Sequence, residues 1–137
     1  MAKNRIKKPE SEKSKRISIP DVDNYDAKPP IFSLERLQNG AYCFSKLEKD
    51  DKSLFAEAIF KRRNLTWTQV RNIARHGLGS EKIAKKSIKT ALPVFVKDDI
   101  ESFLAFRFSG LKAMVGYRIR DIFYVLWFDH DFSLYDH

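Results

Sequence analysis

Arginine, tyrosine and histidine side chains gather in the last third of the chain, and four of them could act on a substrate: Arg107, His130, Tyr135 and His137. An arginine can hold a phosphate through paired hydrogen bonds, and a histidine with an ordinary pKa of about 6.5 can move protons near neutral pH. Metal-free RNA cleavage needs a base for the 2′-hydroxyl, an acid for the leaving oxygen and cations for the phosphorane. These residue types therefore indicate a site that grips a phosphodiester and has groups suited to cleaving it. The alternative is a packed sheet with solvated polar positions.

Three apolar runs separated by short polar turns must position these residues. The runs cover residues 103–108, 113–119 and 122–128. Because short turns join neighbouring strands antiparallel, we expect an antiparallel meander. The third run is apolar at almost every position, which predicts an interior strand.

Side chains alternate between the two faces of a strand, so Leu104, Phe106 and Phe108 are expected to pack on helices. Arg107 then turns to the other, open face. The alternation leaves open whether Tyr117 or Arg118 shares that face with Arg107.

Upstream of the meander, the patterns predict a hairpin and two helices. Asn39-Gly40 between residues 31–37 and 41–47 is typical of a hairpin turn. A helix capped by Asp50 or Asp51 should follow, with an apolar stripe at helical spacing. Thr66 and Gln69 have the spacing of a capping box for a second helix, which Gly77 and Gly79 would end. Residues 80–89 fit either a short amphipathic helix or a basic loop.

Length and composition favour one folded domain with an anionic partner. The chain has 137 residues, is 43% hydrophobic and carries a net charge of +8. Such a charge favours nucleic acid, an anionic surface or an acidic protein as partner. Residues 1–16 hold seven Lys or Arg and almost no apolar residue, so we expect a disordered basic tail and linker over 1–30 and a single domain over 31–137.

Cysteine usage and hydropathy exclude several other classes. A single cysteine, Cys43, allows neither an intramolecular disulfide nor a cysteine-based zinc cluster. No apolar run approaches the roughly 20 residues that span a bilayer. We therefore expect a cytoplasmic protein with no membrane partner.

The order of a first strand or hairpin, two helices and a three-stranded meander with Arg, Tyr and His resembles the RelE/ParE toxin-like superfamily. The similarity covers roughly residues 42–137 and rests on element order and on the tail "Arg…Gly-Tyr-Arg…Phe-Tyr-Val-Leu-Trp…Tyr-Asp-His". It implies an α+β fold with a small antiparallel sheet of about four to five strands and the two helices packed on one face. It also implies a bacterial or phage toxin of the toxin-antitoxin type, a ribosome-dependent mRNA endonuclease that needs no metal or other cofactor and is inhibited by an antitoxin.

The same resemblance suggests a role for each candidate residue. Arg107 would bind the phosphate, and Tyr135 and His137 would form the catalytic group, with His130 as a further catalytic candidate. The RNA-binding or ribosome-binding candidates are Lys82, Lys85, Lys86, Lys89 and Arg118.

Three other interpretations remain at this point. A small non-catalytic protein of phage or mobile-element type could bind nucleic acid or a protein partner through its basic tail and residues 82–89. An inhibitor of a host enzyme could use exposed aromatic side chains. A metal site could use acidic and histidine side chains near the C-terminus, but they lack a recognised ligand spacing. These side chains are Asp129, His130, Asp131, Asp136 and His137.

Overall fold

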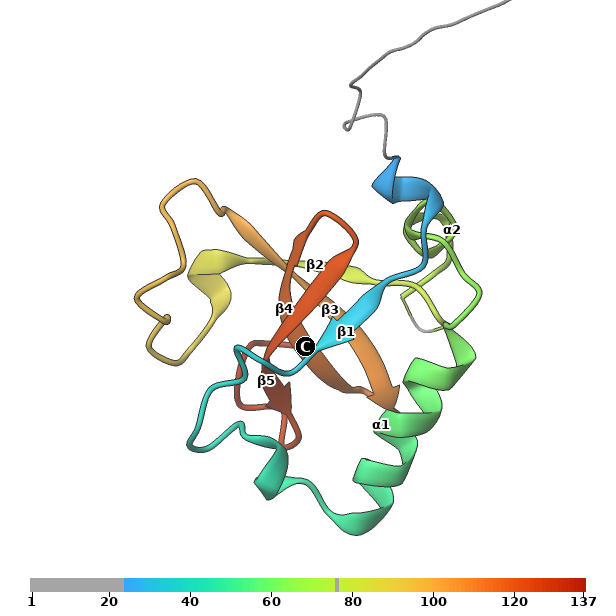
Figure 1. Cartoon of the computed structure of the whole chain (residues 1–137). Helices are drawn as coiled ribbons and strands as arrows, with labels where there is room; N and C mark the ends of the chain where they lie inside the picture. Colours follow the sequence, from blue (N-terminus) through green and yellow to red (C-terminus); the bar gives the residue numbers. More distant parts are fainter. Residues whose placement is uncertain (1–23, 76) are drawn as a thin grey trace, which may run out of the picture.

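A computed structural model describes residues 24–75 and 77–137 and shows an α+β arrangement (Figure 1). Its centre is a five-stranded sheet in the order β1-β5-β4-β3-β2. Two helices, α1 (Lys49–Lys61) and α2 (Trp67–Asn72), complete the fold. The basic tail predicted over residues 1–16 lies outside the described residues.

The predicted meander is confirmed. Its strands are β3 (Ser102–Ser109), β4 (Lys112–Ile119) and β5 (Ile122–Asp129), paired antiparallel in that order. Gly110 and Arg120 take positive φ angles of 59° and 57° in the two connecting turns. β5 lies between β4 and β1, as its continuous apolar sequence predicted.

The sheet is mixed, and the predicted hairpin is wrong. β1 (Ile31–Ser33) pairs parallel with β5, and residues 41–47 form no strand. Gly40 does turn the chain, with a φ of 117°. The chain then follows the outer edge of β5, where the Gln38 N–H donates to the Leu126 carbonyl (3.0 Å) and the Phe128 N–H donates to the Tyr42 carbonyl (2.8 Å). Residues 38–42 thus form hydrogen bonds with the unpaired backbone of β5 instead of with each other in a hairpin.

Both predicted helices form, with different ends. The expected cap at Asp50 or Asp51 is wrong: α1 begins after Glu48, and Asp51 lies in the first turn, where it binds the Lys112 Nζ of β4 at 2.7 Å. The capping box of Thr66 and Gln69 at the start of α2 is confirmed. α2 ends at Asn72, before the two glycines that we expected to stop it. The chain folds back closely there, since a Cβ on Gly79 would lie 2.0 Å from the carbonyl oxygen of Ile73.

Residues 80–89 are neither a helix nor simply a loop. They contain β2 (Glu81–Ala84), which pairs antiparallel with β3, and the 3-10 turn η4 (Lys85–Ser87). The edge of β3 offers backbone partners that a short isolated helix lacks, so pairing overrides the local pattern.

The two faces of the sheet are covered differently. Helices α1 and α2 cover the face that carries Leu104, Phe106 and Phe108, as predicted. The second face, which we expected to be open, is also covered: irregular chain from residues 88–100 and from the C-terminal segment packs on it. Its covering side chains are Ile88, Val96, Ile100, Leu134 and Tyr135. The alternation of side chains along a strand does not show whether irregular segments pack on its face, so this layer was not predicted.

The pairing of Arg107 with Ala113 shows which residues of β4 share the face of Arg107, and β5 carries a bulge beside β4. Val115 pairs with Trp127 but Gly116 pairs with Val125, so Leu126 is an extra residue. Only glycine fits there, because a Cβ on Gly116 would lie 1.8 Å from the carbonyl oxygen of Tyr124. Tyr117 packs within the second face, which Arg107 shares, whereas Arg118 lies over the Trp67 ring on the helix face.

The described chain begins with residues that we had placed in the linker. They form the 3-10 turn η2 (Tyr25–Ala27), and the Lys28 carbonyl accepts a hydrogen bond from Trp67 at the start of α2. Asp26 pairs with Arg118 of β4 at 2.6 Å. Among the described residues, no helix has the length and apolar character to cross a bilayer.

Candidate functional site

Arg107 and Asp129 lie in one cross-strand row on the second face. Arg107 pairs with Ala113, and Ala113 pairs with Asp129. Directly paired residues share a face, and strands are about 4.8 Å apart, so the row spans about 10 Å. The meander therefore places an arginine and a carboxylate at the same end of the sheet face.

Asp129 binds the C-terminal segment through both carboxylate oxygens. Its Oδ1 accepts from the Leu134 N–H (3.1 Å), and its Oδ2 lies 2.6 Å from the Nε2 of His137. Asp129 is 0% exposed, whereas the His137 side chain is 17% exposed. A carboxylate can only accept, so Nε2 carries the hydrogen and Nδ1 is left as the basic nitrogen of the imidazole. This is the arrangement in which a buried carboxylate orients a histidine for proton transfer.

Tyr135 supports the imidazole ring. The two rings stack with centroids 4.2 Å apart and planes 24° apart. Burial raises the pKa of Tyr135 to about 12, and the nearby charges of Glu81 and Asp129 act in the same direction. Arg107 and Arg75 oppose this shift. The phenol therefore keeps its proton at neutral pH. We call Arg107, Asp129, Tyr135 and His137 the Asp129 cluster.

The neighbouring charges are partly matched. Arg75 Nη1 binds Glu81 Oε2 of β2 at 2.8 Å. Within residues 24–75 and 77–137, the half-buried Arg107 side chain forms no ion pair, including with the acidic residues at 98, 99 and 101 that precede β3. No described residue therefore neutralises its charge, which can bind an anionic ligand.

A second arginine, Arg62, contacts the backbone of Arg107 from the helix face of the sheet. It follows the end of α1 and is only 1% exposed. Its guanidinium donates to the carbonyls of Ala58 (2.9 Å), Leu78 (2.9 Å) and Arg107 (3.3 Å). Burial lowers its pKa to about 10, a value at which the group stays protonated at neutral pH. Arg62 thus connects three parts of the chain: α1, the segment before β2, and β3. It also adds positive charge near Arg107.

A hollow of about 370 Å³ opens beside these arginines, between α1 and the end of β3. Its basic lining residues are Lys61, Arg62 and Arg107, and Glu57 is its acidic one. Because Arg62 is bonded to three carbonyls, a phosphate group in this hollow would meet Lys61 and Arg107.

His130 does not join the Asp129 cluster. Its Nε2 lies 2.8 Å from the Ala41 carbonyl, and its ring is tilted against Tyr42. The acidic residues near it are also separated, since Asp131 binds Ser133 and Asp136 pairs with Lys89. Within the part of the chain that the structure describes, no group of three or more His, Cys, Asp or Glu side chains could hold a metal ion, which argues against the metal-site interpretation of this segment.

The RNA-binding candidates do not form one strip. Lys82 of β2 pairs with Leu104 and so lies on the helix face of the sheet. Lys85 donates from Nζ to the Lys97 carbonyl (3.4 Å), and Lys86 is exposed. Lys89 pairs with Asp136 at 2.5 Å. Arg118 is bound to Asp26 on the opposite face from Arg107.

From the sequence we identified Arg107, Tyr135 and His137, considered Asp129 only as a possible metal ligand, and did not identify Arg62. A carboxylate at the end of a strand that is apolar on both faces is a detectable signal for Asp129, because such a group must be buried and hydrogen-bonded. Arg62 gave no signal: in sequence it is one of three basic residues that suit a helix C-terminus.

Comparison with protein-family models, with curated proteins and with solved structures gave no match for this chain.

Proposed function

We propose that this protein binds RNA and cleaves it without a metal ion, as the resemblance to RelE-like toxins suggests. The observation that carries the proposal is the hydrogen bond between His137 and the fully buried Asp129, in a cluster that includes Arg107. A surface histidine without such a partner would have neither a fixed tautomer nor a fixed orientation.

The proposed reaction uses the substrate's own 2′-hydroxyl as nucleophile. The Nδ1 of His137 takes the 2′-hydroxyl proton while the 2′-oxygen bonds to phosphorus. Arg107 stabilises the charge of the phosphorane, with Arg62 as a buried cation behind it. The bond to the 5′-oxygen then breaks, and the imidazolium returns the proton to that oxygen. The products are a 2′,3′-cyclic phosphate and a 5′-hydroxyl end.

Asp129 and Tyr135 act through His137 in this scheme. Asp129 accepts the hydrogen of Nε2 and stabilises the imidazolium, and Tyr135 fixes the ring plane by stacking. His130 has no part in it, because it is bound to the Ala41 carbonyl.

Induced expression in a bacterium, with growth and mRNA integrity followed together, tests this function. The wild type should arrest growth and shorten mRNA, and Arg107→Ala should abolish both effects. His137→Gln should do the same, because glutamine can still donate to Asp129 but cannot take up a proton. The matched control is Arg71→Ala, which removes an arginine whose pair with Asp26 is exposed and lies outside the cluster.

Cleavage that persists in both site variants would contradict the assigned roles. Normal growth with intact mRNA in the wild type would favour the second class of function, a non-catalytic protein that binds nucleic acid or a protein partner. Loss of binding on deletion of residues 1–16, with Arg107→Ala binding normally, would support that class.

A further inference from the structure

A larger hollow lies at the other end of the second face. Its volume is about 820 Å³, and small-molecule sites typically have about 300–1,000 Å³. It lies between the loop that follows β1 and the loop before β3, over the end of β4. Among its lining residues are Arg36, Phe95, Lys97, Ile100, Tyr117 and Ile119. We call it the Arg36 pocket.

Aromatic rings hold the guanidinium of Arg36 in this pocket. Its central carbon lies 4.1 Å from the Tyr124 ring centroid and 5.7 Å from that of Phe95. Its Nη1 also donates to the Tyr117 hydroxyl. Aromatic rings and guanidinium planes are the surfaces on which proteins stack nucleobases. The exposed side of the Phe95 ring can therefore stack on a planar aromatic ligand, with the Arg36 guanidinium beside it.

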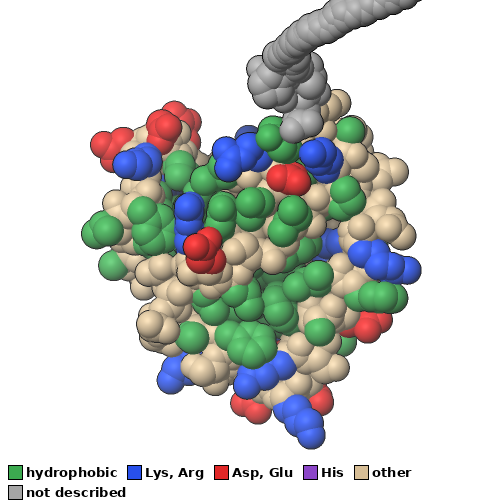
Figure 2. All heavy atoms as spheres, viewed as in Figure 1, with side chains coloured by type: hydrophobic (Ala, Val, Ile, Leu, Met, Phe, Trp, Pro, Cys, Tyr) green, Lys and Arg blue, Asp and Glu red, His purple; other side chains and the backbone are tan. Residues whose placement is uncertain are grey.

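Phe95 is partly exposed at the wall of the pocket, although its ring lies against the Arg36 guanidinium. It is 36% exposed, belongs to neither buried core cluster and lies in the loop that also carries Val94. Figure 2 shows that apolar side chains spread over one face of the molecule, with basic side chains among them. A ligand that covers the Phe95 ring would remove this apolar surface from water, as in other ligand-binding pockets.

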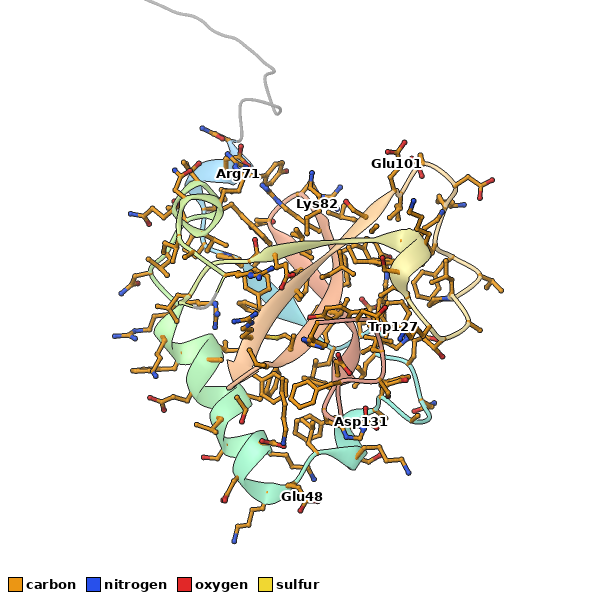
Figure 3. The ribbon with its side chains drawn as sticks, turned by 180° about the vertical axis from the view of Figure 1, so that it is seen from behind. Glu48, Arg71, Lys82, Glu101, Trp127 and Asp131 are labelled. Carbon is orange, nitrogen blue, oxygen red and sulfur yellow. The ribbon has the colours of Figure 1, made fainter. Side chains whose placement is uncertain are left out.

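Basic side chains at the pocket can bind an anionic group on that ligand. Arg36 and Lys97 line it, and the Nζ of Lys85 reaches the Lys97 carbonyl at its border. Two lining residues are acidic, Asp99 and Glu101. Glu101 lies at an outer corner, with its side chain directed away from the sheet (Figure 3).

We propose that the Arg36 pocket binds a nucleobase and its attached phosphate, with the base stacked on Phe95 beside Arg36 and the phosphate bound by Lys97 and Lys85. The ligand is either a free nucleotide or one nucleotide within a single-stranded RNA. The pocket is separate from the Asp129 cluster, so this proposal goes beyond the cleavage reaction and does not depend on it.

Binding to the purified full chain tests the proposal with two probes: adenosine and guanosine 5′-monophosphates, and a single-stranded RNA of about eight nucleotides. Phe95→Ala should weaken binding about 5- to 150-fold, since stacking of one base contributes about 1–3 kcal/mol. Lys97→Ala should weaken it and flatten its salt dependence. The control is Val94→Ala, because Val94 is 101% exposed, adjacent to Phe95 and not in the lining.

The two probes distinguish the sources of the ligand. Phe95-dependent binding of the monophosphates identifies a free-nucleotide site, and binding of the RNA alone with the same dependence identifies a subsite for one nucleotide of a strand. The proposal is overturned if neither probe binds, or if Phe95→Ala and Val94→Ala have equal effects while circular dichroism shows both variants folded. Because the readout is binding, it stands apart from loss of cleavage in Arg107→Ala.

Discussion

The two ends of the second sheet face use basic and aromatic side chains in opposite ways. At the Asp129 cluster, the C-terminal segment buries a carboxylate and a tyrosine, and the histidine has a fixed partner. At the Arg36 pocket, two loops stand apart and leave a hollow of about 820 Å³ with an exposed phenylalanine. In Figure 3, Asp131 marks the first end and Glu101 the second.

The difference separates two demands on a site. Proton transfer needs groups held at fixed distances and shielded from water, which burial provides. Ligand exchange needs an accessible surface. Side chains at such a surface make few packing contacts, so they contribute little to the stability of the fold. We therefore expect substitutions at the closed end to alter stability and activity together, and substitutions at the open end to alter binding alone.

The largest effect should follow Arg62→Ala. This substitution leaves the carbonyls of Ala58, Leu78 and Arg107 without their donor and opens a cavity beneath the closed end. We expect a loss of about 3–4 kcal/mol in the free energy of unfolding, measured by urea denaturation. Arg63→Ala is the matched control, because its bond to the Phe60 carbonyl is exposed and its loss should cost less than about 1 kcal/mol. Equal losses would contradict the structural role of Arg62.

Asp129→Ala should have the next largest effect. It removes the partner of both the Leu134 N–H and His137, so the C-terminal segment loses its attachment. We expect a loss of about 2–3 kcal/mol in unfolding free energy. Asp129→Asn retains an acceptor for Leu134 and should lose less stability, yet it should lose cleavage as fully as the alanine variant. Cleavage by the asparagine variant at the wild-type rate would show that Asp129 serves only to attach the segment.

Tyr135 predicts a pH dependence at the closed end. Its pKa rises from 10.0 to about 12 on folding, so the folded state holds the phenolic proton more tightly than the unfolded state. The resulting stability is fully present below pH 10 and is lost as the pH rises from about 10 to 12, by roughly 2–3 kcal/mol. Tyr135→Phe should remove this part of the alkaline destabilisation in denaturation series. An unchanged pH profile in that variant would show that other groups account for it.

The smallest effect on stability should come from the open end. Phe95→Ala should change the unfolding free energy by less than about 1 kcal/mol, because the ring is partly exposed and outside the buried clusters. The comparison of the two ends fails if Phe95→Ala destabilises the protein as much as Asp129→Ala in the same denaturation experiment.

How well the sequence predicted the fold depended on the range of the interactions. The meander and the capping box of α2 are determined by neighbouring residues, and both were predicted. The parallel pairing of β1 with β5 and the pairing of β2 with β3 depend on distant backbone edges, which local patterns do not encode. The same holds for Arg36 of the pocket, whose ring partners Phe95 and Tyr124 are far from it in sequence.

Incubation of the purified protein with mRNA on translating ribosomes, in the presence of a chelator and followed by end analysis of the RNA, tests the central claim most directly. We expect new 2′,3′-cyclic phosphate and 5′-hydroxyl ends with the wild type, and none with His137→Gln or Arg107→Ala. Intact mRNA with the wild type, or the same ends with His137→Gln, would contradict it.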